Sequence, residues 1–232
     1  MERPCLVLIP GLLNDADLWR DPVAALSSAY DVRVADITQG ETMAALAQVV
    51  FSIAPERFSV AGFSLGGYVA QEMLRQAPDR IERLALLDTA IRIDTPQKTA
   101  ERRTLSRLAA ASGRFLGMGD RMMRTYLSPE HAADTEMTGR VRAMTQRLGL
   151  EVFLRQNALE RTDGEAVLRS FTRPILILCG EDDAITPLAG HREMADLALD
   201  GELVVAPGCG HLTPIEAPVL VSAALDRWMR RT

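Results

Sequence analysis

Residues 57–74 read RFSVAGFSLGGYVAQEML, a strand-like run joined to a helix-like run by a glycine-rich turn. The apolar run over 57–61 predicts a short buried strand, and the apolar spacing over 65–76 predicts a helix. Between them lies Gly62-Phe63-Ser64-Leu65-Gly66, a G-x-S-x-G sequence. A serine at such a strand-to-helix turn projects its hydroxyl above the edge of a sheet.

The two glycines of this motif have a steric explanation. Side chains at Gly62 and Gly66 would collide with the neighbouring backbone of a strained turn, so their absence leaves Ser64 accessible. The helix that begins after Ser64 also directs free backbone N–H groups toward the hydroxyl. Because the spacing also arises by chance, a plain Gly-Ser turn is the alternative interpretation. The flanking strand and helix favour Ser64 as a nucleophile.

Strand-like and helix-like segments alternate along much of the chain, which is typical of a parallel sheet with crossover helices. Predicted strands cover 6–9, 32–35, 57–61, 81–87, 175–179 and 203–206. Predicted helices cover 18–27, 42–53, 65–76 and 218–231. The fold class is therefore α/β, with a mostly parallel sheet flanked by helices.

The alternation stops between residues 91 and 173, where only helical patterning is found. We interpret 1–90 and 174–232 as one core interrupted by a helical insertion over 91–173, which is longer than an ordinary loop. Residues 92–173 carry a net charge of +5, and the remainder carries −10. An arginine-rich solvated helix face explains this asymmetry, and the alternative is an insertion that attracts anionic substrates.

The bulk composition excludes several classes of protein. The 232 residues carry a net charge of −5, which does not favour nucleic acid as a partner. No apolar stretch reaches the roughly 18 residues of a membrane span, so we expect no membrane association. The N-terminal apolar run is too short for a signal peptide, and the three cysteines are scattered, which predicts free thiols and a cytoplasmic protein. No sequence feature specifies an oligomeric state.

The chain contains three histidines, so the candidates for a general base can be compared one by one. His131 lies in the insertion and His191 in a helical stretch, and a surface role is expected for both. His211 follows Gly208-Cys209-Gly210 in a loop between the last strand and the last helix. A histidine that moves protons between nucleophile and leaving group is well placed on such a loop.

The acid that orients His211 should lie between Ser64 and His211, since the order in this arrangement is Ser, Asp or Glu, His. Asp182 and Asp183 directly follow the predicted strand over 175–179, and Asp88 at the end of the strand over 81–87 is a third candidate. An acid at any of these strand ends could accept the imidazole N–H.

Four segments, 6–13, 62–67, 180–187 and 208–218, together resemble the α/β-hydrolase superfamily, specifically its small, lidded esterase-like members. The family pattern G-x-x-D-x-x-x-P falls on Gly180, Asp183 and Pro187, so the resemblance assigns the acid to Asp183. The family segment Gly-x-Gly-His, followed by an acidic residue and proline, falls on 208–211, Glu216 and 218. The resemblance implies that the insertion is a cap.

By the same resemblance, the backbone N–H groups of Leu12 and Leu65 form an oxyanion hole. This chain has Pro10-Gly11 where the family has His-Gly, which affects the geometry of the loop but not its main-chain donors. Leu13, Met118, Met122 and Met144 are the predicted substrate-binding residues, since methionine fits irregular apolar pockets. Phe115, Met123, Leu148 and Phe153 belong to the same apolar set, for which packing inside the cap is the alternative.

The resulting hypothesis is a serine hydrolase that cleaves a small or medium carboxylic ester, or a lactone, through an acyl-enzyme. The implied partner is a small ester-like molecule, with no cofactor and no metal. The same triad serves carbon–carbon bond hydrolases and lyase-like enzymes of this fold, because fold and triad do not define the substrate. A low-turnover ligand receptor on this fold is an alternative of a different class.

Overall fold

A computed structural model describes residues 3–111 and 115–231, and its centre is a parallel sheet of six strands. The strands are β1 (Cys5–Ile9), β2 (Asp31–Val34), β3 (Phe58–Phe63), β4 (Ile81–Leu87), β5 (Ile175–Gly180) and β6 (Gly201–Ala206). Their order is β2-β1-β3-β4-β5-β6, and every pair is parallel. The predicted α/β architecture is confirmed.

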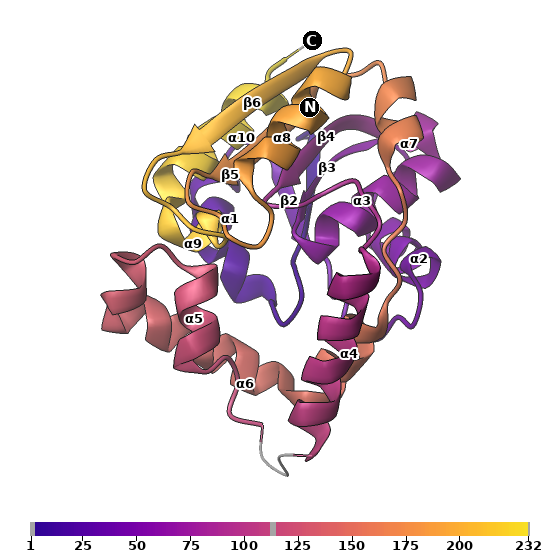
Figure 1. Cartoon of the computed structure of the whole chain (residues 1–232). Helices are drawn as coiled ribbons and strands as arrows, with labels where there is room; N and C mark the ends of the chain where they lie inside the picture. The colour runs from indigo at the N-terminus through magenta and orange to yellow at the C-terminus, as the bar shows by residue number, and fades with distance from the viewer. Residues whose placement is uncertain (1–2, 112–114, 232) are drawn as a thin grey trace.

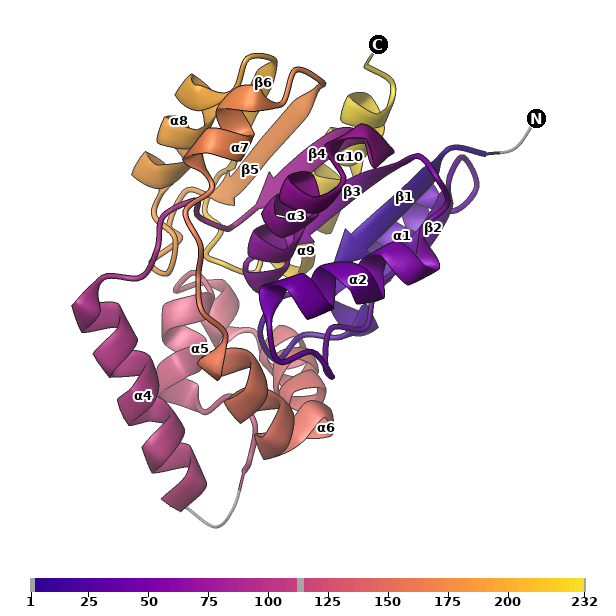
Figure 2. The same cartoon turned by 90° about the vertical axis from the view of Figure 1, so that its right-hand side faces the viewer.

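Helices cover both faces of the sheet (Figures 1 and 2). One face carries α2 (Met43–Ile53), α3 (Leu65–Gln76), α7 (Glu165–Ser170) and α8 (Leu188–Leu197). The other carries α1 (Arg20–Leu26), α9 (Thr213–Glu216) and α10 (Pro218–Met229). Alternate strand residues enter the two cores: Val7 and Ile9 face α2 and α3, whereas Leu6 and Leu8 face the other side.

The observed strands differ from the predicted ones mainly at their ends. The strand predicted over 57–61 does not end before Gly62: β3 continues to Phe63, which pairs with Leu87 of β4. The residues that follow β3, β4 and β5 are Ser64, Asp88 and Glu181. Because the strands are parallel, these residues come to the same carboxyl edge of the sheet, where ligands of open α/β sheets usually bind.

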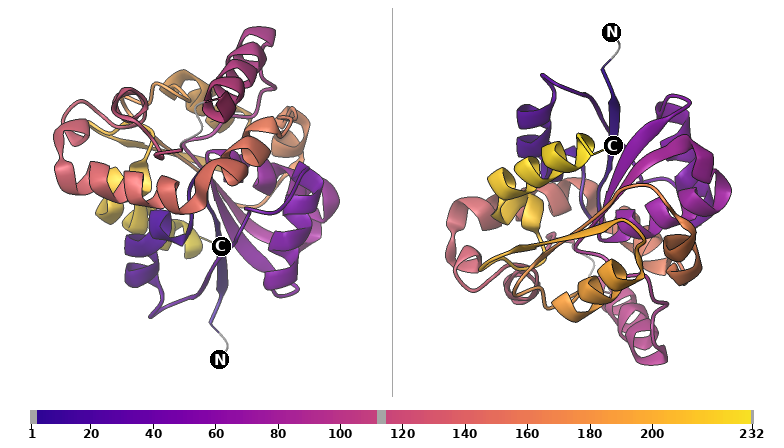
Figure 3. Two further views of the ribbon diagram at one scale, coloured as in Figure 1. Left: turned by 90° about the horizontal axis from the view of Figure 1, so that it is seen from below. Right: turned by 90° about the horizontal axis from the view of Figure 1, so that it is seen from above.

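The segment between β4 and β5 is helical, and its described residues contain no strand. It comprises α4 (Pro96–Ala111), α5 (Asp120–Tyr126), a 3-10 turn (His131–Ala133), α6 (Thr135–Ala158) and α7. Helix α6 is kinked at Gly149, whose φ is +79°. Seen from below, α5 and α6 lie in front of the carboxyl edge of the sheet, and α4 stands to one side (Figure 3). Helix α7 instead packs against α3 and α8.

Ion pairs join α6 to the loop after β1, to the 3-10 turn that follows it (Ala16–Trp19) and to α1. Arg140 contacts Asp17 at 3.3 Å and Asp21 at 2.6 Å, and Arg147 contacts Asp15 at 2.8 Å. Part of the positive charge of the insertion therefore holds it against an acidic part of the core. Over residues 3–111 and 115–231, no helix has the length and apolar character needed to cross a lipid bilayer.

Candidate active site

Ser64 lies on a tight turn between β3 and α3. Its φ of +50° is in the left-handed region that side-chain-bearing residues rarely adopt. Its N–H donates to the carbonyl of Leu87 at 2.9 Å, which ties the turn to β4. A Cβ on Gly62 would collide with the carbonyl of Gly66, and a Cβ on Gly66 would collide with the carbonyl of Ile9. Glycine at both positions is therefore what allows the turn, and Ser64 stays partly exposed.

Two consecutive hydrogen bonds link the side chains of Ser64, His211 and Asp183 at the carboxyl edge of the sheet. The Oγ of Ser64 is 3.0 Å from Nε2 of His211, and Nδ1 of His211 is 2.8 Å from Oδ2 of Asp183. Because a carboxylate only accepts, Nδ1 carries the hydrogen of the neutral ring, which leaves Nε2 free to accept the Ser64 proton. The three predicted residues are thus brought together from loops after β3, β5 and β6.

The buried Asp183 carboxylate is held by several donors. Its Oδ1 accepts the N–H groups of Ile185 at 2.8 Å and Thr186 at 2.9 Å, and its Oδ2 accepts the Thr186 hydroxyl at 2.7 Å. Burial alone would raise the pKa of Asp183, but the charge of His211 and these hydrogen bonds outweigh burial and hold it below its ordinary value. Asp183 is thereby kept ionised beside His211.

His211 is fully buried between two aromatic rings. Phe63 lies with its ring centre 5.2 Å from the imidazole, and Tyr126 of α5 meets the imidazole edge-on at 5.3 Å. The N–H of His211 also donates to the Tyr126 carbonyl at 2.7 Å. The end of α5 is thus attached directly to the loop that carries His211.

The buried Glu216 carboxylate fastens that loop from both sides. It accepts the N–H groups of Gly210 and Leu212, each at 2.9 Å, and so brackets His211 in the sequence. It also accepts the N–H of Ser128 at 2.9 Å, and it lies 2.9 Å from Nδ1 of His131. His131 is therefore half-buried and joined to the core, which corrects the expected surface role.

Asp88, the third candidate for the acid, bonds groups of the core and not the imidazole of His211. Asp88 is fully buried, accepts the N–H of Gly180 at 3.0 Å and bonds the Thr213 hydroxyl, and it makes no hydrogen bond to His211. Burial, and secondarily the nearby Asp183, raises the pKa of Asp88 well above its ordinary value. This carboxyl is therefore not the partner of the imidazole.

The predicted surface role of His191 is wrong, because its side chain is fully buried on the inner face of α8, the helix to which it belongs. Its Nε2 accepts the N–H of Thr89 at 3.1 Å, and the Thr89 hydroxyl donates to the carbonyl of Ser64 at 2.7 Å. Burial lowers the pKa of His191 to about 4, so the ring is neutral at physiological pH. The histidine supports the turn that carries Ser64.

The predicted oxyanion donors lie in the loop after β1 and in the first turn of α3. Leu65 begins α3, so its N–H has no acceptor within the helix. Leu12 is half-buried, and its N–H makes no hydrogen bond to any residue that the structure describes. The neighbouring Leu13 has a φ of +55° and donates its N–H to Oε1 of Gln156 in α6 at 2.8 Å. The insertion therefore fixes the loop that contains Leu12.

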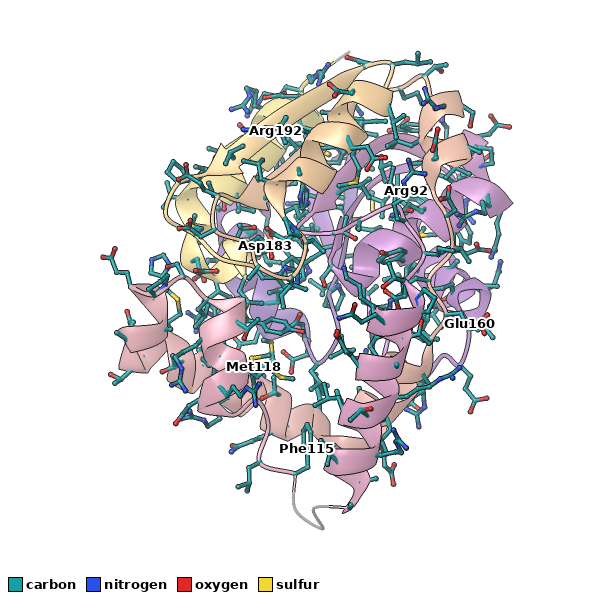
Figure 4. The ribbon with its side chains drawn as sticks, in the orientation of Figure 1. Arg92, Phe115, Met118, Glu160, Asp183 and Arg192 are labelled. Atoms are coloured by element: carbon teal, nitrogen blue, oxygen red, sulfur yellow. The ribbon has the colours of Figure 1, made fainter. Side chains whose placement is uncertain are left out.

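The predicted substrate-binding residues lie mainly in packed surroundings. Leu13, Met118 and Met144 are buried, and Met122 is half-buried. The three methionines belong to or pack against the core cluster that also contains Phe63. Figure 4 shows Met118 on the part of the insertion toward Asp183, with Phe115 farther from it. Their contact with substrate stays a prediction.

Several residues of the site were not found from the sequence. Thr186 lies within the predicted acid motif, where the Asp183 carboxylate accepts the N–H groups two and three residues later; an aspartate that starts such a turn is the signal that could have identified Thr186. Gln156 and Tyr126 lie in the insertion, where helical patterning gives no indication of which side chains face the core. A polar residue on the apolar face of a helix is the signal that could have identified Gln156.

Other nucleophiles and metals do not compete at this site in the described residues. Cys209 is two positions before His211, but burial raises the pKa of its thiol to about 12. Cys5, Cys179 and Cys209 are all buried and unpaired. Within residues 3–111 and 115–231, no group of three His, Cys, Asp or Glu side chains is arranged to hold a metal ion.

Comparison with known proteins gives related sequences and folds. The model of the alpha/beta hydrolase family matches residues 6–224. A pimeloyl-[acyl-carrier protein] methyl ester esterase of Aromatoleum aromaticum is 27% identical over 94% of this chain and 95% of its own length. RutD of Shigella flexneri serotype 5b, provisionally named a carbamate hydrolase, is 26% identical over 97% of this chain and 90% of its own. A thermophilic esterase of Thermogutta terrifontis superposes with a TM-score of 0.86 and 25% identity, covering 99% of this chain and 90% of that one.

Proposed function

The chain belongs to the alpha/beta hydrolase family of enzymes, and from that premise we propose that it is a serine hydrolase that cleaves small or medium carboxylic esters through an acyl-enzyme. One observation carries the proposal. Ser64 Oγ lies 3.0 Å from the free nitrogen of His211, whose other nitrogen is held by the ionised Asp183. This is the geometry in which a hydroxyl is activated as a nucleophile.

The proposed reaction begins with attack of Ser64 Oγ on the ester carbonyl carbon. The Ser64 proton moves to Nε2 of His211 as the Oγ–C bond forms, and the buried Asp183 stabilises the resulting imidazolium. The imidazolium then gives this proton to the alkoxide that leaves, so an alcohol departs and an acyl-Ser64 ester remains. Water attacks that ester by the same proton route, which releases the carboxylic acid and restores Ser64.

The carbonyl oxygen becomes negative in each tetrahedral intermediate and needs fixed donors. We assign this role to the backbone N–H groups of Leu12 and Leu65, neither of which has another acceptor in the described chain. The close approach of Gly66 to the carbonyl of Ile9 supports this assignment, because it brings the start of α3 against the end of β1. The donors need no side chain, so the Pro10-Gly11 sequence is compatible with the function.

The size of the substrate is inferred from the packing of the insertion. Met118 and Met144 are buried in the cluster that contains Phe63, and we infer that their flexible side chains rearrange to admit a short or medium acyl chain. Ester hydrolysis also agrees with the names of two relatives, a methyl ester esterase and a thermophilic esterase.

Labelling with a fluorophosphonate tests the nucleophile. We expect one covalent adduct on wild type, located at Ser64, and none on Ser64→Ala. Ser59→Ala is the matched control, since Ser59 is a buried serine of β3, the strand before Ser64, and its hydroxyl has no hydrogen-bond partner among the described residues. Absence of labelling on wild type, or equal labelling of Ser64→Ala, would refute an activated Ser64.

Turnover of p-nitrophenyl esters of increasing acyl length tests the reaction class. We expect hydrolysis of the short and medium esters, a decline with long acyl chains, and a loss of about four to six orders of magnitude in kcat for Ser64→Ala. Labelling without turnover of any ester would contradict ester hydrolysis and favour another reaction of the same triad, such as carbon–carbon bond hydrolysis.

A further inference from the structure

Arg161 lies in the segment that runs from α6 back toward α7 and α3 (Figures 1 and 2). Its guanidinium carbon is 5.7 Å from the centre of the Tyr68 ring. Tyr68 is one helical turn after Ser64 in α3. The charge of Arg161 also acts on the hydroxyl of Tyr126, the ring that lies edge-on to His211. Arg161 thus lies over an aromatic ring of the helix that follows Ser64, and its charge acts on a second ring that contacts His211.

The guanidinium of Arg161 has no acidic partner within residues 3–111 and 115–231. Its hydrogen bond goes to a backbone carbonyl, that of Leu159, at 2.7 Å. The charge of Asp94 raises the pKa of Arg161, but Asp94 forms its ion pair with Arg102, at 2.7 Å, so it compensates the charge of Arg161 only in part. Other arginines of the insertion, such as Arg140, are paired with core carboxylates.

This environment is unfavourable for a cation that has no ligand. Burial is the main cause that lowers the pKa of Arg161 to about 10, and the neighbouring Arg102 lowers it further. A buried charge is normally paired, because its desolvation is otherwise not compensated. Arg161 is nevertheless only half-buried, so part of the side chain remains accessible to a solute.

The hydroxyl of Tyr126 is a second polar group without a partner here, since it makes no hydrogen bond to another described residue. Its pKa is raised by burial, and by the charge of Asp183, against the opposing effect of Arg161. The hydroxyl therefore remains a donor at neutral pH. An arginine and a phenol together supply the donors that a carboxylate accepts.

We propose that Arg161 binds a carboxylate on the substrate, so that the preferred esters are anionic half-esters of dicarboxylic acids. The inference rests on the proposed function and specifies the substrate class of the same site. The ester end of such a molecule is placed at Ser64, and the acid end accepts hydrogen bonds from Arg161, with Tyr126 beside it. Arg161 is a specificity-determining residue in this assignment, because it contacts the substrate away from the reacting atoms.

Binding to the inactive Ser64→Ala protein tests the inference without requiring turnover. The probes are the monomethyl and dimethyl esters of succinic, glutaric and adipic acid, titrated by calorimetry. We expect at least one monomethyl ester to bind about 10- to 100-fold more tightly than its dimethyl counterpart, the usual effect of a charge-assisted hydrogen bond. Adding Arg161→Gln should remove this preference, whereas Arg161→Lys should keep part of it.

Arg107→Gln is the matched control, because it removes the same net charge from the protein. Arg107 is an exposed arginine of α4 that donates to the Thr104 hydroxyl. The control should leave the preference unchanged. Equal binding of monoesters and diesters, or a preference that survives Arg161→Gln, would overturn the inference. The proposed function fails separately, through absent fluorophosphonate labelling of wild type, so the two failures are distinguishable.

Discussion

The carboxylate of Glu216 accepts the backbone N–H of Gly210 at 2.9 Å, immediately before His211 in the chain. The same carboxylate accepts the N–H of Leu212, immediately after it, and the N–H of Ser128 from the insertion. These bonds place the imidazole and attach the insertion to its loop at one point. Glu216 is therefore a positioning residue for the proposed base.

Replacing Glu216 with glutamine should weaken both stability and catalysis. The amide nitrogen would face a backbone N–H in place of an accepting oxygen, which should lower the free energy of unfolding by about 1–3 kcal/mol. Misplacement of His211 should lower kcat by about 10- to 100-fold with KM little changed. Denaturant unfolding and steady-state kinetics measure the two effects. Glu41→Gln, at an exposed site away from this loop, should change neither; an unchanged kcat in Glu216→Gln would contradict the positioning role.

The identity of the acid can be tested with one conservative substitution at two positions. Asp183→Asn removes the charge that stabilises the imidazolium and should lower kcat by roughly four orders of magnitude. The raised pKa of Asp88 favours its protonated form, so Asp88→Asn replaces one neutral hydrogen-bonding group with another and should keep kcat within about threefold. Comparable losses in both variants, measured with a p-nitrophenyl ester, would show that the assignment of roles is wrong.

The parts of this site that could be predicted are those determined by residues close together in the sequence. The turn at Ser64 depends on residues within a few positions of it, so the sequence pattern from 57 to 76 was sufficient to place it. His211 was selected among three histidines by its loop, and Asp183 was selected by a family motif. His211 lies 147 positions from Ser64 and 28 from Asp183 in the sequence, but the order of strands in a parallel sheet brings their loops together.

The parts that were not predictable depend on which helix face meets the core. His191 lies in a helix of mixed polarity, and only the packing of α8 on β5 and β6 shows that its ring is buried. Gln156 bonds the N–H of Leu13 across 143 positions and the carbonyl of Ile37 at 3.2 Å. No periodicity in the sequence specifies a side chain that serves two loops of another layer.

The close contact of Gly66 with the end of β1 predicts a specific effect of adding one methyl group. Gly66→Ala would force the first turn of α3 away from the carbonyl of Ile9, and with it the N–H of Leu65. If this N–H is the proposed oxyanion donor, its displacement should lower kcat by about 10²- to 10³-fold. Gly190→Ala is the control, because a Cβ there meets no atom within 4 Å and alanine is favoured inside a helix. The kcat of each variant is measured with the same ester. Equal values for Gly66→Ala and Gly190→Ala would contradict the prediction.

The buried, neutral His191 predicts how stability depends on pH. Its pKa is about 4 when folded and about 6.5 when unfolded, so between these values the unfolded chain binds a proton that the folded protein does not. The free energy of unfolding should therefore fall as the pH is lowered from 6.5 to 4, by about 3 kcal/mol from this group.

Asp88 acts in the opposite direction over part of the same range. Its folded pKa lies above its unfolded value, so its contribution to stability is present at low pH and is lost as the pH rises. Asp183, whose folded pKa is depressed, contributes above its unfolded pKa near 3.8, and that contribution is lost only as the pH falls further. The wild-type curve alone therefore does not isolate His191.

The contribution of His191 is obtained from the difference between wild type and His191→Gln, measured by denaturant unfolding from pH 7 to pH 4. Glutamine can still accept the N–H of Thr89, but it does not titrate. The two curves should converge by about 3 kcal/mol as the pH falls, because the variant lacks the proton uptake of the unfolded histidine. Parallel curves would mean that the folded protein protonates His191 as readily as the unfolded chain does, which its buried contact with Thr89 should prevent.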